Sequence, residues 1–599
     1  MEMDRMSLAG FILMFLLLAG YFLYFAPSPE AGTTQVNDST AVTLPKSPEK
    51  PALDTAIASI FVQAPDTAST DQTLRNEDLE ISFSRNGSIS LARLIKHKTY
   101  DQKPLFLIRE GSSDFSLKTA INGVETDLFA LPFTAEHKTG KDGTELHFSA
   151  ITAEGQSIRH IWTLPAKGYL LGYRLETKGM VLQRENIELT WINRMPLVEK
   201  DITDSRGKTA ITFHTTEDEI DGLSESSVEV EAMTLPAGVN WVGMKQKFFL
   251  SAILSTTAIN GGEIETRVEP GDETTVKTGK MLLRIPAGEV SDTGVSLSYY
   301  LGPNDYRALG ELAEGFEENV YLGWPPVKWV NEYFILPVFY FLTKWTSNFG
   351  LIIIILVIVV RLVLLPLSYK SYLGMAKMRL LKPELDEIKK RFPDDQMKFS
   401  QEQMKLFNEA GASPLSGCLP LLFQMPILFA MFYLFPSCIE FRQQTLPFAE
   451  DISTYDSVIN FSFTIPFLGN HLSIYTLLMT VSTLVITWQN NQMSTVEGPM
   501  KSLSYIMPLI FLFVLNSFPA SLSFYYLVGN VASFIQQIAI RRFVDEDKIR
   551  QVMEAHRKKM AENPNSGQSA FMTRLSNSLK ASEEARRASQ EARKKNKRS

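Results

Sequence analysis

Cysteine is scarce in this sequence, whose 599 residues include only Cys418 and Cys438. Both lie in or beside one apolar run, so the polar region from residue 75 to residue 320 contains no disulfide, whatever compartment it occupies. The cysteine count therefore gives no information about cellular location.

Acidic side chains are missing from the five apolar runs that lie between residues 348 and 540. Proton relays and carboxylate ion sites, the usual equipment of coupled transporters, need acidic groups inside the membrane. The sequence also shows no internal repeat of the kind that many transporters have. Both absences argue against a transporter or channel, which is the first alternative from another functional class.

Motifs for nucleotide or metal binding are also missing from the polar region. Gly207-Lys208-Thr209 resembles the end of a phosphate-binding loop, but the earlier glycine of that motif is replaced by Ile202. The histidines at positions 97, 137, 147, 160 and 214 are scattered, without metal-ligand spacing. We therefore expect no metal, no cofactor and no enzymatic activity, and a groove for peptide or sugar stays open.

Long apolar runs, in contrast, predict an α-helical membrane bundle with six spans. The first run, residues 7–25, is long enough for a hydrocarbon core of roughly 30 Å. A signal peptide is the alternative, but the run exceeds the usual signal core and no clean cleavage site follows, so we expect residues 1–25 to form an uncleaved anchor. The five-helix core, residues 348–540, is expected to span at 348–367, 418–436, 471–489, 503–517 and 519–540.

The charges of the connecting segments predict the orientation of these spans. Residues 368–382 carry four basic side chains and no acidic one, whereas residues 437–470 carry one arginine and four acidic side chains. The positive-inside rule then places the segment 368–417 in the cytoplasm. An even number of spans puts both termini inside and residues 26–345 outside, which is the periplasm in a cell with two membranes.

The region outside the membrane divides into a linker and a folded domain. Residues 26–74 are rich in Pro, Ser, Thr and Ala, which indicates a flexible linker. Between residues 75 and 320, short alternating segments separated by turns predict a large extracytoplasmic β-sandwich domain. The clearest predicted strands are residues 79–84, 88–94, 169–177, 187–193, 248–255 and 295–302.

Two further segments flank the predicted spans. Residues 321–347 mix aromatic side chains with lysines, which predicts an amphipathic helix at the outer membrane surface. Residues 368–417 are expected to form a cytoplasmic hairpin with helices at 368–392 and 396–410. Its methionines either offer flexible contacts to varied partners or pack the two helices together. The candidate hairpin residues are Met375, Lys377, Met378, Arg379 and Met404.

One arginine, Arg361, lies inside the otherwise apolar run 348–367. A charged side chain near the bilayer centre costs roughly 2.5–3.5 kcal/mol on insertion scales. Either this side chain snorkels to the cytoplasmic headgroups, or it faces a water-filled cavity open to the cytoplasm. A sugar-binding envelope protein that uses the bundle only as an anchor, the second alternative, gives the arginine no purpose.

Other runs supply polar side chains that either share such a cavity or bond to a neighbouring helix. These are Gln424, Ser521, Ser523, Asn530, Gln536 and Gln537. Moving a polar segment of another protein across hydrocarbon is costly, and a water-filled cavity shortens the dry path. A cavity with one positive charge and no acidic partner suits transient binding of a negative or polar segment.

Three separated segments resemble the YidC/Oxa/Alb insertase family. They are VVRLVLLPLSYKSYLGMAKMRLLKPEL, ASPLSGCLPLLFQMPILFAMFYL and FPASLSFYYLVGNVASFIQQ, and they match in order and spacing across residues 320–545. With the N-terminal anchor and the large outer domain, the layout resembles the Gram-negative bacterial form of the family over nearly the whole chain. The outer domain resembles the family by position, length and strand character alone.

The resemblance implies a membrane protein insertase and chaperone of the bacterial inner membrane, acting alone or with the Sec translocon and its accessory subunits. Five core helices would enclose a hydrophilic groove, open to cytoplasm and lipid. Expected partners are nascent membrane proteins, the translocon and membrane lipids. Because residues 351–360 are all apolar, polar lining must come from other helices. The implied groove residues are Arg361, Gln424, Met425, Pro426, Tyr525 and Tyr526, to which the polar pattern adds Asn530 and Gln536.

The last segment, residues 541–599, carries 16 Lys or Arg against 8 Asp or Glu. This basic cytoplasmic tail either meets ribosomal RNA or is a solvated segment that only satisfies the positive-inside rule. A ribosome is thus a further candidate partner. The densest basic cluster consists of Lys594, Lys595, Lys597 and Arg598.

Overall fold

The computed structural model describes residues 60–62, 72–140, 143–180, 182, 185–286, 295–393, 395–412, 419–466, 468–493 and 499–562. The chain forms two compact units, the first ending at Val320 and the second beginning at Tyr321. The predicted anchor, most of the predicted linker and the tail beyond residue 562 lie outside the described residues.

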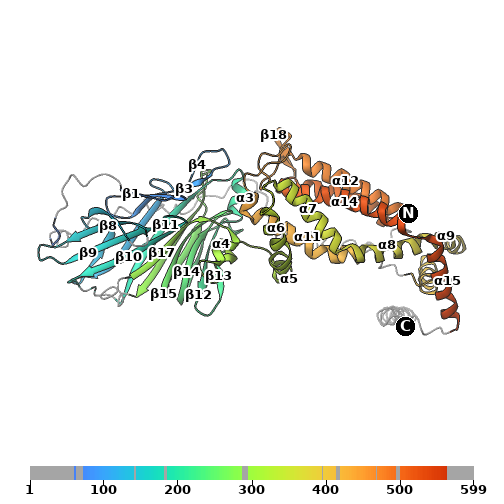
Figure 1. The fold of residues 1–599 in the computed structure, drawn as a ribbon, viewed down its shortest axis with the longest axis horizontal. Helices are drawn as coiled ribbons and strands as arrows, with labels where there is room; N and C mark the ends of the chain where they lie inside the picture. The colour runs from blue at the N-terminus through green and yellow to red at the C-terminus, as the bar shows by residue number, and fades with distance from the viewer. Residues whose placement is uncertain are drawn as a thin grey trace, which may run out of the picture. The chain divides into compact units, whose positions relative to one another are not determined.

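The first unit is built on two antiparallel sheets (Figure 1). The smaller sheet follows chain order and contains β1 (Gln72–Arg75), β2 (Leu79–Phe83), β3 (Ile89–Lys98) and β4 (Pro104–Ile108). The larger sheet has 13 strands in the order β6-β5-β11-β16-β15-β17-β10-β9-β8-β7, and β14, β12 and β13 branch from β15. Its strands are β5 (Ser113–Ile121), β6 (Val124–Asp127), β7 (Thr134–Thr139), β8 (Thr144–Ile151), β9 (Ser157–Leu164), β10 (Leu170–Lys178), β11 (Asn186–Pro196), β12 (Ala210–Thr215), β13 (Ile220–Gly222), β14 (Glu231–Lys245), β15 (Phe249–Arg267), β16 (Thr275–Pro286) and β17 (Val295–Pro303). The short helices of this unit are η2 (Leu128–Ala130), α3 (Ile202–Arg206), α4 (Tyr306–Gly310) and η4 (Phe316–Asn319).

Aromatic side chains from both sheets form the core of this unit. The Phe83 ring of β2 lies 5.2 Å from the Trp162 ring of β9, and 6.0 Å from the Phe148 ring of β8, measured between centroids. The alternation of buried and partly exposed residues along β2 is the pattern of a strand with one face against a core. Each of the six predicted strand segments overlaps a strand. A large β-rich domain preceding the helical unit is therefore confirmed.

The second unit is mainly helical. It contains α5 (Pro325–Val330), the π-helix η5 (Asn331–Ile335), α6 (Leu336–Thr343), α7 (Phe349–Val363), α8 (Leu365–Leu380), α9 (Lys382–Arg391), α10 (Gln396–Glu409), α11 (Leu419–Ser437), η7 (Ile439–Phe441), α12 (Ile474–Met493), α13 (Pro499–Leu515), α14 (Ala520–Phe543) and α15 (Glu546–Glu562). One short hairpin, β18 (Ile459–Ile465) with β19 (Gly469–Leu472), lies between α11 and α12. Neither this hairpin nor α15 was predicted from the sequence.

The predicted span at 348–367 is not one continuous helix. It is divided between α7 and the first residues of α8, and the two helices are bent by 61°. Pro366, in the first turn of α8, has no N–H to continue the α7 hydrogen-bond ladder, which explains the break. Among the described helices, none alone combines the length and hydropathy of a membrane span, whereas α7 and α8 do so as a bent pair. The six spans remain a prediction.

The segment predicted as a surface helix, residues 321–347, forms α5, η5 and α6 in succession. The buried Asn331 amide donates to the carbonyl of Leu322 and to the carbonyl of Ala430 in α11, each at 2.9 Å. Large aromatic side chains, among them Trp329, Tyr333 and Trp345, are exposed along the same segment. One face is thus fixed to the bundle while another carries aromatic rings outward.

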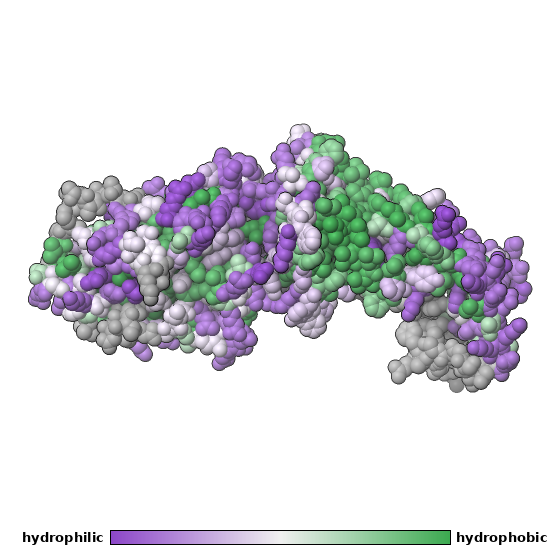
Figure 2. All heavy atoms as spheres, viewed as in Figure 1, coloured by the Kyte–Doolittle hydropathy of each residue, from purple (hydrophilic) through white to green (hydrophobic). Residues whose placement is uncertain are grey.

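The helices of the second unit expose an apolar surface. Figure 2 shows hydrophobic residues gathered over α7, α12 and α14, and hydrophilic residues over α9 and α15. On α12 the exposed residues recur at helical spacing and form one stripe along the helix. They are Leu477, Val481, Val485 and Trp488. Patches of this kind rarely face water in soluble monomers.

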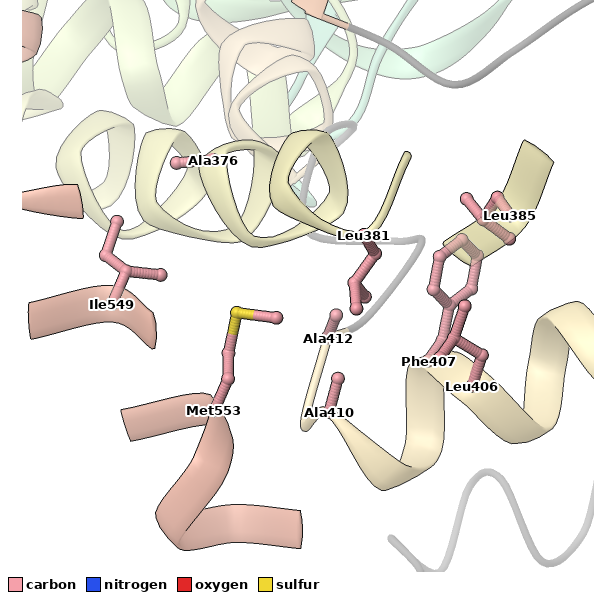
Figure 3. Close-up of a cluster of buried hydrophobic side chains, with 9 residues drawn as sticks. All are labelled: Ala376, Leu381, Leu385, Leu406, Phe407, Ala410, Ala412, Ile549 and Met553. Carbon is pink, nitrogen blue, oxygen red and sulfur yellow. The ribbon is translucent and has the colours of Figure 1, made fainter. Parts of the chain in front are cut away.

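The segment predicted as a two-helix hairpin contains three helices, because the first predicted helix is divided at Leu381 into α8 and α9. Pro383 lies in the first turn of α9 and accounts for the division. The predicted second helix is confirmed as α10. A cluster of buried apolar side chains joins α8, α9 and α10 to α15 (Figure 3).

Candidate functional site

A cavity of about 250 Å³ lies in the second unit. Its lining comes from α8, α11, α12 and α14 and from the last turn of α7. Helix α7 contributes the single charged group of its lining, and α11, α12 and α14 contribute amides and a hydroxyl. Helix α8 contributes residues 368, 371, 372 and 375, which share one helical face by their spacing. The lining consists of Arg361, Ser368, Ser371, Tyr372, Met375, Gln424, Asn490, Ser533, Gln536, Gln537 and Ile540.

Arg361 reaches this cavity from the last turn of α7. Its Nη2 donates to the backbone carbonyl of Gly529 in α14 at 3.1 Å. The Ser533 hydroxyl donates to the same carbonyl at 2.8 Å. Among the residues that the structure describes, no carboxylate forms an ion pair with Arg361, so its positive charge is held in place by a neutral group. Arg361 therefore lines a cavity, as one of the two alternatives from the sequence requires.

The amide side chains of α14 add unpaired hydrogen-bonding atoms. Gln537 donates through Nε2 to Oδ1 of Asn490 in α12 at 3.2 Å, while its Oε1 is buried without a partner among the described residues. The Gln536 Nε2 is likewise buried and unpartnered there. Buried polar groups without partners cost about 1–3 kcal/mol each. Both atoms therefore favour a polar ligand or water within the cavity.

The other predicted groove residues lie near the cavity without lining it. Asn530 turns toward α12 and donates to the Ser482 hydroxyl at 2.9 Å and the Thr483 hydroxyl at 2.8 Å. Tyr525 is buried, with its ring 5.8 Å from that of Phe435 in α11. The remaining members are partly buried residues on the same two helices, namely Met425, Pro426 and Tyr526.

Seven lining residues were not among the predicted groove residues, although Gln537 was named among the polar side chains of the runs, and an eighth, Met375, was predicted only for the hairpin. A helical spacing of i, i+3, i+4 and i+7 connects Ser368, Ser371, Tyr372 and Met375, and this signal was available in the sequence. The same spacing connects Ser533, Gln536, Gln537 and Ile540 on α14. Asn490 carries no such local signal, and only the packing of α12 against α14 brings it to the site.

The predicted hairpin residues are mostly engaged within the protein. Lys377 donates through Nζ to the carbonyl of Gly411 at 3.1 Å, and Arg379 forms an ion pair with Glu546 of α15. Met378 packs against the apolar cluster, and Met404 is partly buried. The predicted tail residues, Lys594, Lys595, Lys597 and Arg598, lie outside the described residues.

Away from the cavity, buried polar groups join α12, α13 and the β18–β19 hairpin. Asp456 accepts from the Ser473 hydroxyl at 2.6 Å and from the backbone N–H of Ile474 at 2.6 Å, which caps the start of α12. Asn516 donates to the carbonyls of Leu468 at 2.8 Å and His471 at 2.7 Å. These groups therefore satisfy one another's hydrogen-bonding capacity at this end of the bundle.

A larger hollow of about 670 Å³ lies on the surface of the first unit. The sequence had not excluded a groove for a peptide or a sugar on this domain. Two of its charged lining residues, Asp101 and Lys103, pair with each other at 2.6 Å. Among the described residues, no group of three or more His, Cys, Asp or Glu side chains has the arrangement of a metal site. The amide-rich cavity of the second unit is thus the stronger candidate site.

Comparison with known proteins identifies the class to which this architecture belongs. Residues 306–548 match the family described as "60Kd inner membrane protein", and residues 72–336 match the family described as "YidC periplasmic domain". The chain is therefore a membrane protein with a periplasmic domain.

Curated relatives narrow this class to one family. The chain is 37% identical to a protein of Amoebophilus asiaticus named "Membrane protein insertase YidC", over 97% of this chain and 99% of that one. It is 38% identical to the protein of that name from Cytophaga hutchinsonii, over 97% and 98%. The chain belongs to the YidC family of membrane protein insertases, which confirms the resemblance seen in the sequence.

A solved structure titled "Active YidC insertase crystal structure with the first transmembrane domain resolved" is 17% identical to this chain. It covers 88% of this chain and 97% of its own, with a TM-score of 0.32.

Proposed function

We propose that the Arg361 cavity receives a polar segment of a client membrane protein while the client's apolar helix passes into the lipid. The observation that carries this proposal is a guanidinium group without an acidic partner among the described residues, in a cavity whose other polar atoms include unpaired amides. A polar segment can exchange hydrogen bonds with water for hydrogen bonds with these groups. The polar segment then crosses a shorter distance of hydrocarbon without hydrogen-bond partners.

Electrostatics makes the site selective for one kind of segment. A charge acts more strongly in a partly buried site than in bulk water, because the surrounding dielectric is lower. Arg361 should therefore attract a segment that carries Asp or Glu, and the carbonyl of Gly529 holds the guanidinium without cancelling its charge. The apolar stripe on α12 offers the client helix a lipid-facing surface along which to leave.

The same proposal covers the wider role of the chain. It acts as an insertase and chaperone in the bacterial inner membrane, alone or with the Sec translocon and its accessory subunits, with both termini in the cytoplasm. Burial of apolar client surface drives insertion, aided by the membrane potential acting on client charges. The chain needs no covalent step for this, and the basic tail beyond residue 562 is the candidate contact with ribosomes.

The test is insertion of a small two-span client into liposomes that contain only the purified chain. Wild type is compared with Arg361→Ala and Arg361→Glu, and Lys390→Glu on the exposed side of α9 is the matched charge-reversal control. Hydrogen bonds to charged groups contribute about 1.5–3 kcal/mol, so Arg361→Glu should lower insertion about tenfold or more. The control should insert as wild type does.

A second client, with the acidic residues of its polar segment changed to lysine, sharpens the test. Arg361→Glu should insert this client better than wild type does, because the attraction is restored with opposite signs. If both clients respond to the variant in the same way, the electrostatic part of the proposal is wrong. If wild type inserts neither client above empty liposomes, the chain does not work alone, and a translocon-dependent chaperone is the correct description.

A further inference from the structure

Helix α15 continues the chain almost directly from the cavity helix α14. Only Val544 and Asp545 separate the end of α14 at Phe543 from the start of α15 at Glu546. The Asp545 carboxylate accepts from the backbone N–H groups of Asp547 at 3.0 Å and Lys548 at 3.4 Å. Such a short, capped connection couples the direction of α15 to that of α14.

Two apolar residues of α15, Ile549 and Met553, lie four positions apart and therefore on one helical face. Both are buried, in a helix that is otherwise rich in charge. They enter a cluster to which α8, α9, α10 and their connecting residues contribute (Figure 3). The other members are Ala376, Leu381, Leu385, Leu406, Phe407, Ala410 and Ala412.

Polar contacts surround this cluster and fix the position of α15 along the hairpin. Arg557 donates through Nη2 to both carboxylate oxygens of Glu384, each at 2.8 Å. The His556 Nδ1 donates to the carbonyl of Glu409 at 3.1 Å. At the other end of α15, Glu546 pairs with Arg379. The contacts thus run from the first residue of α15 to its penultimate turn.

The helices joined in this way are two walls of the candidate site. Helix α8 carries Ser368 through Met375 of the lining, and its next turns carry Ala376 of the cluster and Arg379 of the ion pair. Helix α14 carries Ser533 through Ile540 of the lining and leads directly into α15. A displacement of α8 from α14 that widens the cavity must therefore break the contacts of α15.

We propose that α15 is a latch that positions α8 relative to α14 and so sets the width of the Arg361 cavity. With the latch closed, the cavity has the volume described above. With the latch released, α8 and the hairpin move from α14 and the cavity admits a longer client segment. The role of the latch in client binding rests on the proposed function, but the movement of α8 from α14 is tested separately from insertion.

The primary test compares Met553→Glu with Val552→Glu. Met553 is 6% exposed within the cluster, whereas its neighbour Val552 is 56% exposed, so the two variants add the same charge to the same turn on different faces. Each is combined with Gln536→Cys in a chain whose native cysteines are replaced by serine. The readout is the rate at which a water-soluble maleimide, added on the cytoplasmic side of membrane vesicles, labels position 536.

Met553→Glu should raise this labelling rate several-fold, and Val552→Glu should leave it at the level of the parent. Because a buried glutamate can also disturb folding, a charge exchange provides an independent test. Glu384→Arg alone should raise labelling, and Glu384→Arg with Arg557→Glu should return it toward the parent value. A merely local structural role of the pair does not change the accessibility of position 536.

The proposal is overturned if limited proteolysis shows α15 released in Met553→Glu while position 536 is labelled at the parent rate. It is also overturned if Glu384→Arg with Arg557→Glu does not return the labelling rate toward the parent value. Neither result affects the proposed function, which is judged by insertion with the wild-type chain. Conversely, failure of wild-type insertion leaves the labelling comparison fully interpretable.

Discussion

Arg361 and Gly529, 168 residues apart in the chain, are joined by a hydrogen bond from the guanidinium Nη2 to the glycine carbonyl at 3.1 Å. A backbone carbonyl is neutral and fixed by its helix, so it orients the arginine without pairing its charge. The Ser533 hydroxyl donates to the same oxygen at 2.8 Å. The last turn of α7 and the segment from Gly529 to Ser533 of α14 thus present one oriented positive charge to the cavity.

The side chain at position 529 should therefore control where this charge lies. A Cβ at Gly529 would lie 3.5 Å from the arginine Nη2, an ordinary contact distance, so Gly529→Ala should insert clients as wild type does. Gly529→Leu should displace the guanidinium from its carbonyl and lower insertion about tenfold, the equivalent of one hydrogen bond to a charged group. The liposome assay measures both, and equal activity of the two variants would show that the position of Arg361 is unimportant.

Asn530 should behave differently from its neighbour, since its amide bonds to α12 rather than lining the cavity. Hydrogen bonds between membrane helices contribute about 0.6 kcal/mol each on average, so Asn530→Ala should destabilise the helical unit by roughly 1 kcal/mol. The thermal midpoint in detergent can be followed in a Cys418→Ser chain with a thiol-reactive dye that reports exposure of the buried Cys438. Cross-linking of a client at position 536 should be unchanged, and its loss would make Asn530 a groove residue after all.

Asn516 should be the more costly asparagine to replace. It is fully buried, donates to two carbonyls and accepts from the backbone N–H of Ser473 at 2.9 Å. Asn516→Ala leaves these three partners without a hydrogen bond, at a cost of about 1–3 kcal/mol each. The free energy of unfolding should therefore fall by roughly 3 kcal/mol or more, measured in the same thermal assay. Asn460→Ala on the exposed hairpin is the matched control, and a comparable loss there would mean that the hairpin itself, not the buried bonds, provides the stability.

The first unit should lose stability as the pH falls, because of His160. This ring is buried, accepts from the Tyr173 hydroxyl at Nδ1, and donates from Nε2 to the carbonyl of Leu128. Burial lowers its pKa from 6.5 to about 4, since the charged ring is poorly solvated there. Between these values the unfolded chain binds a proton that the folded domain does not, so stability decreases from about pH 6.5 down to about pH 4.

The pKa difference corresponds to roughly 3 kcal/mol at the acidic end of this window. Urea unfolding of the full chain at pH 7.5 and pH 4.5, followed by tryptophan fluorescence, should show this loss in wild type and a smaller one in His160→Gln. His137→Gln, on the exposed strand β7, should keep the wild-type slope. An unchanged slope in His160→Gln would assign the acid sensitivity to other groups.

Sequence periodicity was sufficient for six of the strands in the first unit. Strands such as β10 and β11 alternate along most of their length and lie between turn residues, so they were predictable within a few residues. Arg361 was predictable because one charge in an apolar run needs a compensating environment. The break after Val363 was also encoded locally, since Pro366 follows, but an uninterrupted apolar run concealed it.

Tertiary packing decided what the sequence could not. Gln536 lines the cavity and Asn530 does not, although both are amides on α14, because the position of α12 determines which face is open. Helix α15 offers only Ile549 and Met553 as buried apolar residues, a signal too weak to predict docking until the cluster that receives them is known. The carboxylate of Asp456 counted as an outer charge in the sequence, yet it is buried as a helix cap.

The paired groups around Asp456 and Asn516 also bear on the electrical properties of the membrane. Their polar atoms are bonded to one another and to backbone groups, so these buried donors and acceptors already have partners within the protein. Ions and protons cross a bilayer only where free polar groups or water line a path. We therefore expect membrane vesicles that contain this protein to hold a membrane voltage without a leak current through this end of the bundle.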